Sequence, residues 1–207
     1  MLRVVAPLAA AGVLLLSGCM TGERPTLAES PTTTGDPAVD AVLDRLDAAG
    51  TATFTAAYDV LTKFGNVSTP ATVSQDGAAR RSVTIGSVRF LTDDATSATC
   101  GLDGGGCTDS IDAARVSDTQ LAPEFYASSA AARLRRDAGA RVGQTSGSTT
   151  TVGGQAATCV SIPVTGATAM YCALDSGPLA RLDAPDVAIE LTSYTASADE
   201  SLFERPS

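Results

Sequence analysis

The amino-acid sequence predicts an α+β domain built on an antiparallel sheet. Three observations indicate this class: a helix-start signal near residue 36, segments in which apolar and polar residues alternate, and a helical apolar stripe between those segments. The chain has 207 residues, of which 44% are hydrophobic, so one domain with a sizeable core fits its length.

The first predicted helix begins at Asp36-Pro37. Aspartate is a favoured N-cap residue, and proline is favoured at the first helical position. Gly50 supplies the expected end of this helix. Between these points, apolar residues recur at helical spacing at Val39, Val42, Leu43 and Leu46.

Residues 53–64 alternate in the way that a half-buried strand does. One face is predicted to carry Phe54, Ala56, Tyr58, Val60 and Phe64. Asn66 and Pro70 mark the expected turn, and residues 73–75, 81–85 and 88–91 are expected to form further short strands. The apolar residues of the last two segments change phase at Gly86, which predicts a turn or a bulge there.

A second helix is expected over residues 123–138, with Pro123 at its first position. Its last turn is crowded with Arg133, Arg135 and Arg136. Two interpretations stay open: the cations complement the negative end of the helix dipole, or they form a binding patch. We favour the first, because the chain as a whole is acidic.

The clearest local prediction is a C-terminal hairpin. Residues 157–164 and 167–174 flank Thr165-Gly166, and counting outward from this turn places Cys159 opposite Cys172. Alternation makes them a non-hydrogen-bonded pair, whose close spacing suits a cross-strand disulfide. Two more strands, over residues 179–182 and 187–194, complete the expected meander.

The cysteine count indicates an exported domain. Cys19 belongs to the N-terminal signal described below, and the even number that remains predicts two disulfides. Spacing favours local pairing, Cys100 with Cys107 and Cys159 with Cys172. Three consecutive glycines between Cys100 and Cys107 favour a loose loop closed at its base. Metal binding would need C-x-x-C pairs or histidines, and the chain has neither.

The start of the chain has the pattern of a bacterial lipoprotein signal. Arg3 precedes an apolar run too short to span a bilayer, and the run closes with Leu16-Ser17-Gly18-Cys19. This string resembles the lipobox, whose cysteine becomes the lipidated N-terminus. We expect a signal peptide over residues 1–18, lipid on Cys19, a disordered tether over residues 19–35 and one domain over residues 36–207. The domain would then lie outside the cytoplasm, anchored to the outer face of the cell membrane.

Charge and composition restrict the function. A net charge of -9 disfavours binding of nucleic acid by bulk charge. Because the chain has no histidine, Ser-His and Cys-His nucleophile systems are excluded, and no metal or cofactor motif is present. We therefore expect no catalytic residue, no metal and no cofactor. The frequent alanine, with Lys63 as the single lysine, indicates a high-GC, actinobacterial source.

A family resemblance rests on the C-terminal stretch. Asp175-Ser176-Gly177 ends one predicted strand, Leu179-Ala180-Arg181-Leu182 forms the next, and Leu202-Phe203 and Pro206 follow near the end. In these residues and in its order of elements, the chain resembles the Lol-type lipoprotein carriers and their relatives, among them the actinobacterial LppX and LprG lipoproteins and the RseB-like sensors. The resemblance implies a strongly curved antiparallel sheet, an incomplete barrel, wrapped on a few helices. Its hollow side often binds acyl chains. The chain departs from the family in its two disulfides and its shortage of large aromatic residues.

Two classes of function follow. The first is a cell-envelope lipoprotein that binds or carries a hydrophobic ligand, a lipid or acyl chain, in a cavity between sheet and helices. The second is a non-catalytic interaction, sensor or accessory lipoprotein that contacts an envelope protein. The candidate cavity residues are the larger apolar groups on the inward faces: Phe54, Tyr58, Val60, Phe90, Ile162, Tyr171, Ile189 and Leu191. The same residues would serve equally well as plain core.

Lipidation of Cys19 is directly testable. Two or three acyl chains hold a protein firmly at a bilayer, so the Cys19→Ala variant, which has no acceptor thiol, should leave the membrane fraction. The intact mass of membrane-extracted wild-type protein should show an acylated N-terminal cysteine. A Cys19→Ala protein that stays quantitatively membrane-bound would contradict the prediction.

Overall fold

The structure, a computed structural model, describes residues 33–206. The predicted signal peptide, Cys19 and nearly all of the tether lie outside these described residues. Thr34, near the end of the expected tether, already contacts the domain, because its backbone N–H donates to Asp40 Oδ1 over 2.7 Å. No helix in the described range is long and apolar enough to cross a membrane.

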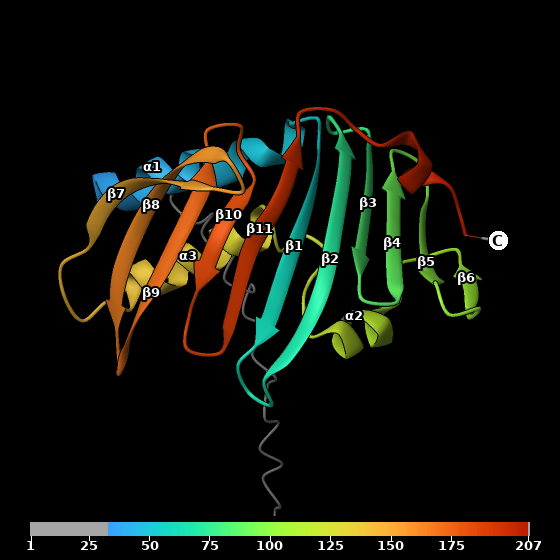
Figure 1. The fold of residues 1–207 in the computed structure, drawn as a ribbon. Helices are drawn as coiled ribbons and strands as arrows, with labels where there is room; N and C mark the ends of the chain where they lie inside the picture. The colour runs from blue at the N-terminus through green and yellow to red at the C-terminus, as the bar shows by residue number, and fades with distance from the viewer. Residues whose placement is uncertain (1–32, 207) are drawn as a thin grey trace, which may run out of the picture. The chain divides into compact units, whose positions relative to one another are not determined.

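A single eleven-stranded antiparallel sheet dominates residues 33–206, and it curves around the helices without closing (Figure 1). Its strand order is β6-β5-β4-β3-β2-β1-β11-β10-β9-β8-β7. The strands are β1 (Phe54–Thr62), β2 (Val67–Asp76), β3 (Arg80–Ile85), β4 (Val88–Asp93), β5 (Ser97–Gly101), β6 (Gly106–Thr108), β7 (Ser146–Val152), β8 (Gln155–Val164), β9 (Ala167–Leu174), β10 (Leu179–Asp183) and β11 (Val187–Thr195). Two meanders, β1 to β6 and β7 to β11, therefore meet where β1 pairs with β11. This architecture is the curved α+β sheet that the sequence predicts.

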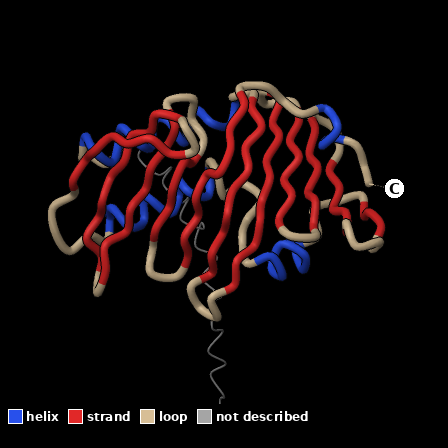
Figure 2. The backbone as a smooth tube through the Cα atoms, viewed as in Figure 1, coloured by secondary structure: helices blue, strands red, loops and turns tan. Residues whose placement is uncertain are grey.

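Three α-helices lie beside the sheet in residues 33–206, two at one half of it and one at the other. They are α1 (Pro37–Ala48), α2 (Ala113–Thr119) and α3 (Ser128–Gly139), with short 3-10 turns η1 (Ala49–Thr51) and η2 (Glu200–Phe203). Figure 2 shows the longer helices together behind one half of the sheet and α2 by itself near the other half. Helix α1 packs on α3 and on β7, β8 and β9, and its N-cap is Asp36 with Pro37 next, as the sequence predicts.

The β1 strand has the predicted inward face, with one exception. Phe54, Tyr58 and Val60 are buried, whereas Phe64 is 92% exposed. Placing Phe64 on the inward face was wrong, because β1 ends at Thr62 and the chain turns before Phe64. The alternation of apolar and polar residues continues past the end of β1 into the turn, so it does not show where the strand ends.

Pro70 lies inside β2 and not in the turn where the sequence places it. It stands opposite Asp59 of β1, and its carbonyl accepts from the Gly86 N–H over 2.9 Å. The nitrogen and the carbonyl of a strand residue point to the same side, so the Pro70 nitrogen also faces the turn at Gly86. Regular pairing of β2 with β3 begins only at Ala71, opposite Ile85. The missing N–H therefore costs no ladder bond. Gly86, with φ of 57°, forms the predicted turn between the paired residues Ile85 and Val88.

The second long helix begins later than predicted. Helix α3 starts at Ser128, and Pro123 lies in the turns that precede it. In these turns the Tyr126 carbonyl accepts the Leu179 N–H of β10 over 2.8 Å, a bond that a helical conformation would direct elsewhere. The turns also place Phe125 and Tyr126 against β1. A sheet contact has therefore overridden a local helix signal.

Both disulfides close hairpins. Cys159 faces Cys172 across β8 and β9 with a Cα–Cα distance of 4.0 Å, in the register counted from Thr165-Gly166. Cys100 faces Cys107 across β5 and β6 at 4.1 Å. Residues 102–105 form the loop between these two strands, and so the loop is longer than a two-residue turn. Both distances match the close, non-hydrogen-bonded kind of cross-strand pair.

One buried amide joins three parts of the fold. Gln75 of β2 is 0% exposed, and its Nε2 donates to the Ala49 carbonyl over 2.7 Å and to the Ala52 carbonyl over 2.9 Å. Its Oε1 accepts from the Tyr126 hydroxyl. Burial raises the pKa of Tyr126 to about 12, which keeps this hydroxyl protonated and able to donate. The amide thus connects the end of α1, the sheet and the segment before α3.

Replacing Gln75 by methionine, which has a similar shape, should destabilise the fold. The Ala49 and Ala52 carbonyls and the Tyr126 hydroxyl would lose a buried partner, and a loss of about 1–3 kcal/mol in the free energy of unfolding is expected. Urea denaturation measures it. Gln155→Met, at a half-buried glutamine, is the matched control and should change stability by less than about 0.5 kcal/mol. Equal stability of the two variants would contradict this role of Gln75.

Candidate functional site

The eight residues predicted to line a cavity all belong to one hydrophobic core. Their exposed fractions run from 0% to 4%. The set is Phe54, Tyr58, Val60, Phe90, Ile162, Tyr171, Ile189 and Leu191. The alternation therefore identified inward-facing residues, and their burial shows that these side chains are packed within the core.

Aromatic side chains from the segment before α3 fill much of that space. Phe125 meets Tyr58 edge to face with ring centroids 5.1 Å apart, and Tyr126 meets Phe54 in the same manner at 5.6 Å. Tyr194 of β11 stacks on Phe54 at 6.0 Å. Burial raises the pKa of Tyr58 well above its usual value, so its hydroxyl is neutral. These rings therefore occupy space on the inward face of β1 that a ligand would otherwise fill.

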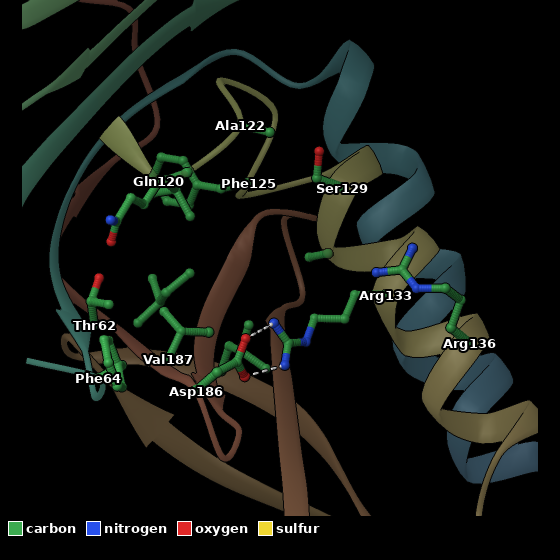
Figure 3. Close-up of a pocket in the computed structure, with 14 residues that line it drawn as sticks. Thr62, Phe64, Gln120, Ala122, Phe125, Ser129, Arg133, Arg136, Asp186 and Val187 are labelled. Atoms are coloured by element: carbon green, nitrogen blue, oxygen red, sulfur yellow. Dashed lines mark hydrogen bonds and ion pairs between the residues drawn. The ribbon is translucent and has the colours of Figure 1, made fainter. Parts of the chain in front are cut away.

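A pocket of about 370 Å³ remains where α3, the connection from α2, the β1–β2 turn and the β10–β11 turn come together (Figure 3). Of the eight predicted cavity residues, Ile189 alone is part of its lining. The lining residues are Thr62, Phe64, Gln120, Leu121, Ala122, Phe125, Ser129, Ala130, Arg133, Arg136, Leu182, Asp186, Val187 and Ile189. The volume falls at the small end of the range of roughly 300–1,000 Å³ that is usual for small-molecule sites.

Apolar groups form both the inner wall and part of the rim of this pocket. Phe125 and Ile189 are buried at 3% and 2%, whereas Phe64 is 92% exposed. An exposed phenylalanine next to a pocket offers apolar area that a bound molecule would cover. The pocket is therefore suited to an apolar group that enters from solvent.

An ion pair crosses one wall of the pocket. Arg133 Nη1 donates to Asp186 Oδ2 over 3.0 Å, and Nη2 donates to Asp186 Oδ1, so the contact is bidentate, as the dashed lines in Figure 3 mark. The hydrogen bond from Arg133 lowers the pKa of Asp186, and the same bond raises the pKa of Arg133. Both groups are therefore charged at neutral pH. The pair fixes α3 to the β10–β11 turn.

The Arg133 side of α3 also holds a buried hydroxyl. Tyr171 donates to Asp137 Oδ2, and Arg133 Nε lies 3.9 Å from the same oxygen. Burial, and then the bond to Asp137, raise the pKa of Tyr171. Of the predicted residues, Tyr171 therefore supports the pocket wall from behind and does not line it.

Within residues 33–206, no group of three or more cysteine, aspartate, glutamate or histidine side chains is placed to hold an ion. The carboxylates near the pocket have other partners. Asp186 pairs with Arg133, and Asp183 pairs with Lys63 over 2.5 Å.

Similarity to known proteins is confined to structure. No protein-family model and no curated protein sequence matches the chain. The MucA/MucB complex of Pseudomonas aeruginosa contains a chain that matches with a TM-score of 0.54 and 12% identity, over 82% of this chain and 61% of that one. A structure of MucB matches with a TM-score of 0.54 and 14% identity, over 84% of this chain and 64% of that one. LppX of Mycobacterium tuberculosis gives a TM-score of only 0.39 at 18% identity, over 77% of this chain and 94% of that one, which is too low to support an argument.

The MucB matches show a shared fold. The fold that they share with this chain agrees with the curved sheet and helices that the sequence resemblance implies. This chain spans about three fifths of the length of the MucB chains that it matches. At this level of identity, the comparison extends to the fold and not to the residues of a site.

Much of the pocket could not be recognised in the sequence. Gln120, Leu121 and Ala122 lie in a connection without periodicity, and Asp186 lies in a short turn. The available signal was the arginine cluster of α3, for which the helix dipole was the favoured explanation. The structure shows that two of these arginines form ion pairs with other segments: Arg133 with Asp186, and Arg135 with Asp47. Tertiary ion pairs, not the dipole alone, thus account for two of the three arginines.

Core and pocket positions should respond differently to truncation. Ile162→Ala removes a side chain that is 0% exposed within the core, and the expected loss is about 2–5 kcal/mol in the free energy of unfolding. Ile189→Ala should cost less, because one side of Ile189 borders the pocket and has fewer packing partners to lose. Urea denaturation of both variants measures the difference. An equal or greater loss for Ile189→Ala would contradict an open pocket at that position.

Proposed function

We propose that the protein binds the apolar part of a lipid or other acyl-chain molecule in the pocket beneath Phe125, on the extracytoplasmic side of the cell membrane. The observation that carries the proposal is the pocket itself. It is open, largely apolar and about 370 Å³ in volume, and it lies between the sheet and α3. Apolar pockets with a few polar groups at one side are the usual form of a small-molecule site.

Location supports the same proposal. The two disulfides are typical of exported proteins, because the cytosol keeps thiols reduced. The lipobox-like string that ends at Cys19 would anchor the domain beside a membrane, where amphiphilic molecules are abundant. We propose no catalytic role, since the chain contains no histidine and the one carboxylate of the pocket wall, Asp186, is committed to an ion pair with Arg133.

A second candidate function is the binding of an envelope protein. The observation that favours it is the match to a MucB chain in a complex with MucA. The exposed Phe64 and Val67 of the β1–β2 region, at 92% and 55%, would then contact the partner. The two candidates differ in what must enter the pocket, so a small-molecule experiment separates them.

Phe64→Ala tests the proposed function. The Cys19→Ala protein, which has no acceptor thiol for the proposed lipid anchor, should bind a fluorescent fatty acid in a saturable manner, and solvent extracts of it should contain lipid. Because Phe64 lines the pocket while remaining exposed, its truncation should weaken probe binding several-fold and change stability by less than about 0.5 kcal/mol.

Val142→Ala is the matched control, since Val142 is 65% exposed and is not among the residues of the pocket. It should leave both probe binding and stability unchanged. No lipid in the extract together with no saturable probe binding would overturn the lipid proposal and leave protein binding as the better candidate.

A further inference from the structure

The three arginines of α3 have different surroundings. Arg133 pairs with Asp186, and Arg135 pairs with Asp47 over 2.5 Å. Arg136 has no ion pair and no side-chain hydrogen bond with any described residue, yet it lines the pocket. In Figure 3 the Arg136 side chain lies across α3, with its guanidinium turned toward the Arg133 side of the helix. Its charge is therefore available to a bound molecule.

Helical spacing explains why Arg136 reaches the pocket and Arg135 does not. Ser129, Arg133 and Arg136 stand at positions i, i+4 and i+7 of α3, which places them on one face of the helix. Arg135 stands about 100° away and contacts α1 through Asp47. The pocket thus meets a stripe of one hydroxyl and two guanidinium groups.

The charge of the pocket differs in sign from that of the whole chain. The charged lining residues are Arg133, Arg136 and Asp186, so two positive charges minus one negative charge leave +1, in a protein whose net charge is -9. Since Arg133 and Asp186 neutralise each other, the remaining positive charge is that of Arg136. An acidic protein repels anions at long range, so a local, unpaired cation beside an apolar pocket acts only at short range, on the head of a molecule that is already held there.

We propose that the pocket selects single-chain amphiphiles with an anionic head, a carboxylate or a phosphate, and that Arg136 binds this head. The proposal rests on the function proposed above and names its ligand class. The apolar chain would contact Phe64, Phe125 and Ile189, and the planar guanidinium would donate to the oxygens of the head. A volume of about 370 Å³ suits one chain and not the several chains of a multiply acylated lipid.

The experiment compares amphiphiles that differ only in the head. The Cys19→Ala protein is titrated calorimetrically, below the micellar range, with dodecanoate, dodecyl phosphate, dodecanol and dodecyltrimethylammonium. The two anions should bind about tenfold more tightly than dodecanol, the gain expected of a charge-assisted hydrogen bond, and the cation should bind least. The preference for anions should diminish as salt is added. Carboxylate and phosphate are distinguished by which of the two anions binds better.

Variants of α3 assign the preference to Arg136. Arg136→Gln should bring the affinity for dodecanoate and dodecyl phosphate down to that for dodecanol, with dodecanol binding unchanged, and Arg136→Lys should retain most of the preference. Arg135→Gln, a neighbour whose partner is Asp47, is the control and should keep the wild-type order of affinities.

The outcomes separate this inference from the proposed function. Dodecanol and the anions binding equally, with no effect of Arg136→Gln, would overturn the inference and leave the apolar pocket in place. Failure of every amphiphile to bind to a protein with a wild-type melting temperature would overturn the proposed function itself. A preference for anions that persists in Arg136→Gln would assign the head to another group and would also overturn the role of Arg136.

Discussion

The pairing of β1 with β11 is the constraint on which the rest of the molecule depends. In chain order these are the first and last strands, but in the sheet they are neighbours near its middle. Thr55 and Thr195, far apart in sequence, therefore stand opposite each other. Without this ladder the chain would be two separate meanders. The same ladder builds the pocket, because it ends with Thr62 opposite Val187 and continues as a 2.9 Å bond from the Lys63 N–H to the Asp186 carbonyl. Residues from opposite ends of the chain thereby become adjacent pocket walls.

In this fold, core side chains and a bound ligand would occupy the same space between the sheet and the helices. The apolar residues on the inward face of a curved sheet must be shielded from water by other side chains. Here Phe125 and Tyr126 cover Tyr58 and Phe54 with edge-to-face contacts. The buried Gln75 fixes Tyr126 in place with a fully partnered amide. The proposed binding pocket lies beyond these aromatic residues, toward α3 and the β10–β11 turn. The pocket is consequently small and has polar groups along one wall, the form expected of a site for an amphiphile with one chain.

Local signals in the sequence predicted the elements whose formation depends on near neighbours. Asp36-Pro37 started α1, Thr165-Gly166 set the hairpin register, and that register placed Cys159 opposite Cys172. Two of the elements that escaped prediction, β7 and α2, lack such signals. Strand β7 is a run of serine and threonine whose residues are exposed up to Val152, so it has no apolar alternation, and α2 is seven residues long with no buried residue. The start of α3 was misplaced because Pro123 is a good first helical residue in isolation, while the Tyr126 carbonyl is bound to β10.

The sequence by itself determined the class of fold, the disulfide pairing and, apart from Phe64, which of the predicted strand residues face inward. Each follows from alternation, turn chemistry and spacing along the chain. The sequence could not show which of the eight predicted cavity residues would be covered by other side chains. Those side chains belong to segments that are distant in sequence. Only the tertiary structure placed Phe125 over Tyr58, brought Asp186 to Arg133 and left Arg136 at the pocket without a partner among residues 33–206. These contacts join segments about 50 to 70 residues apart, and no periodicity in a single segment carries information about them.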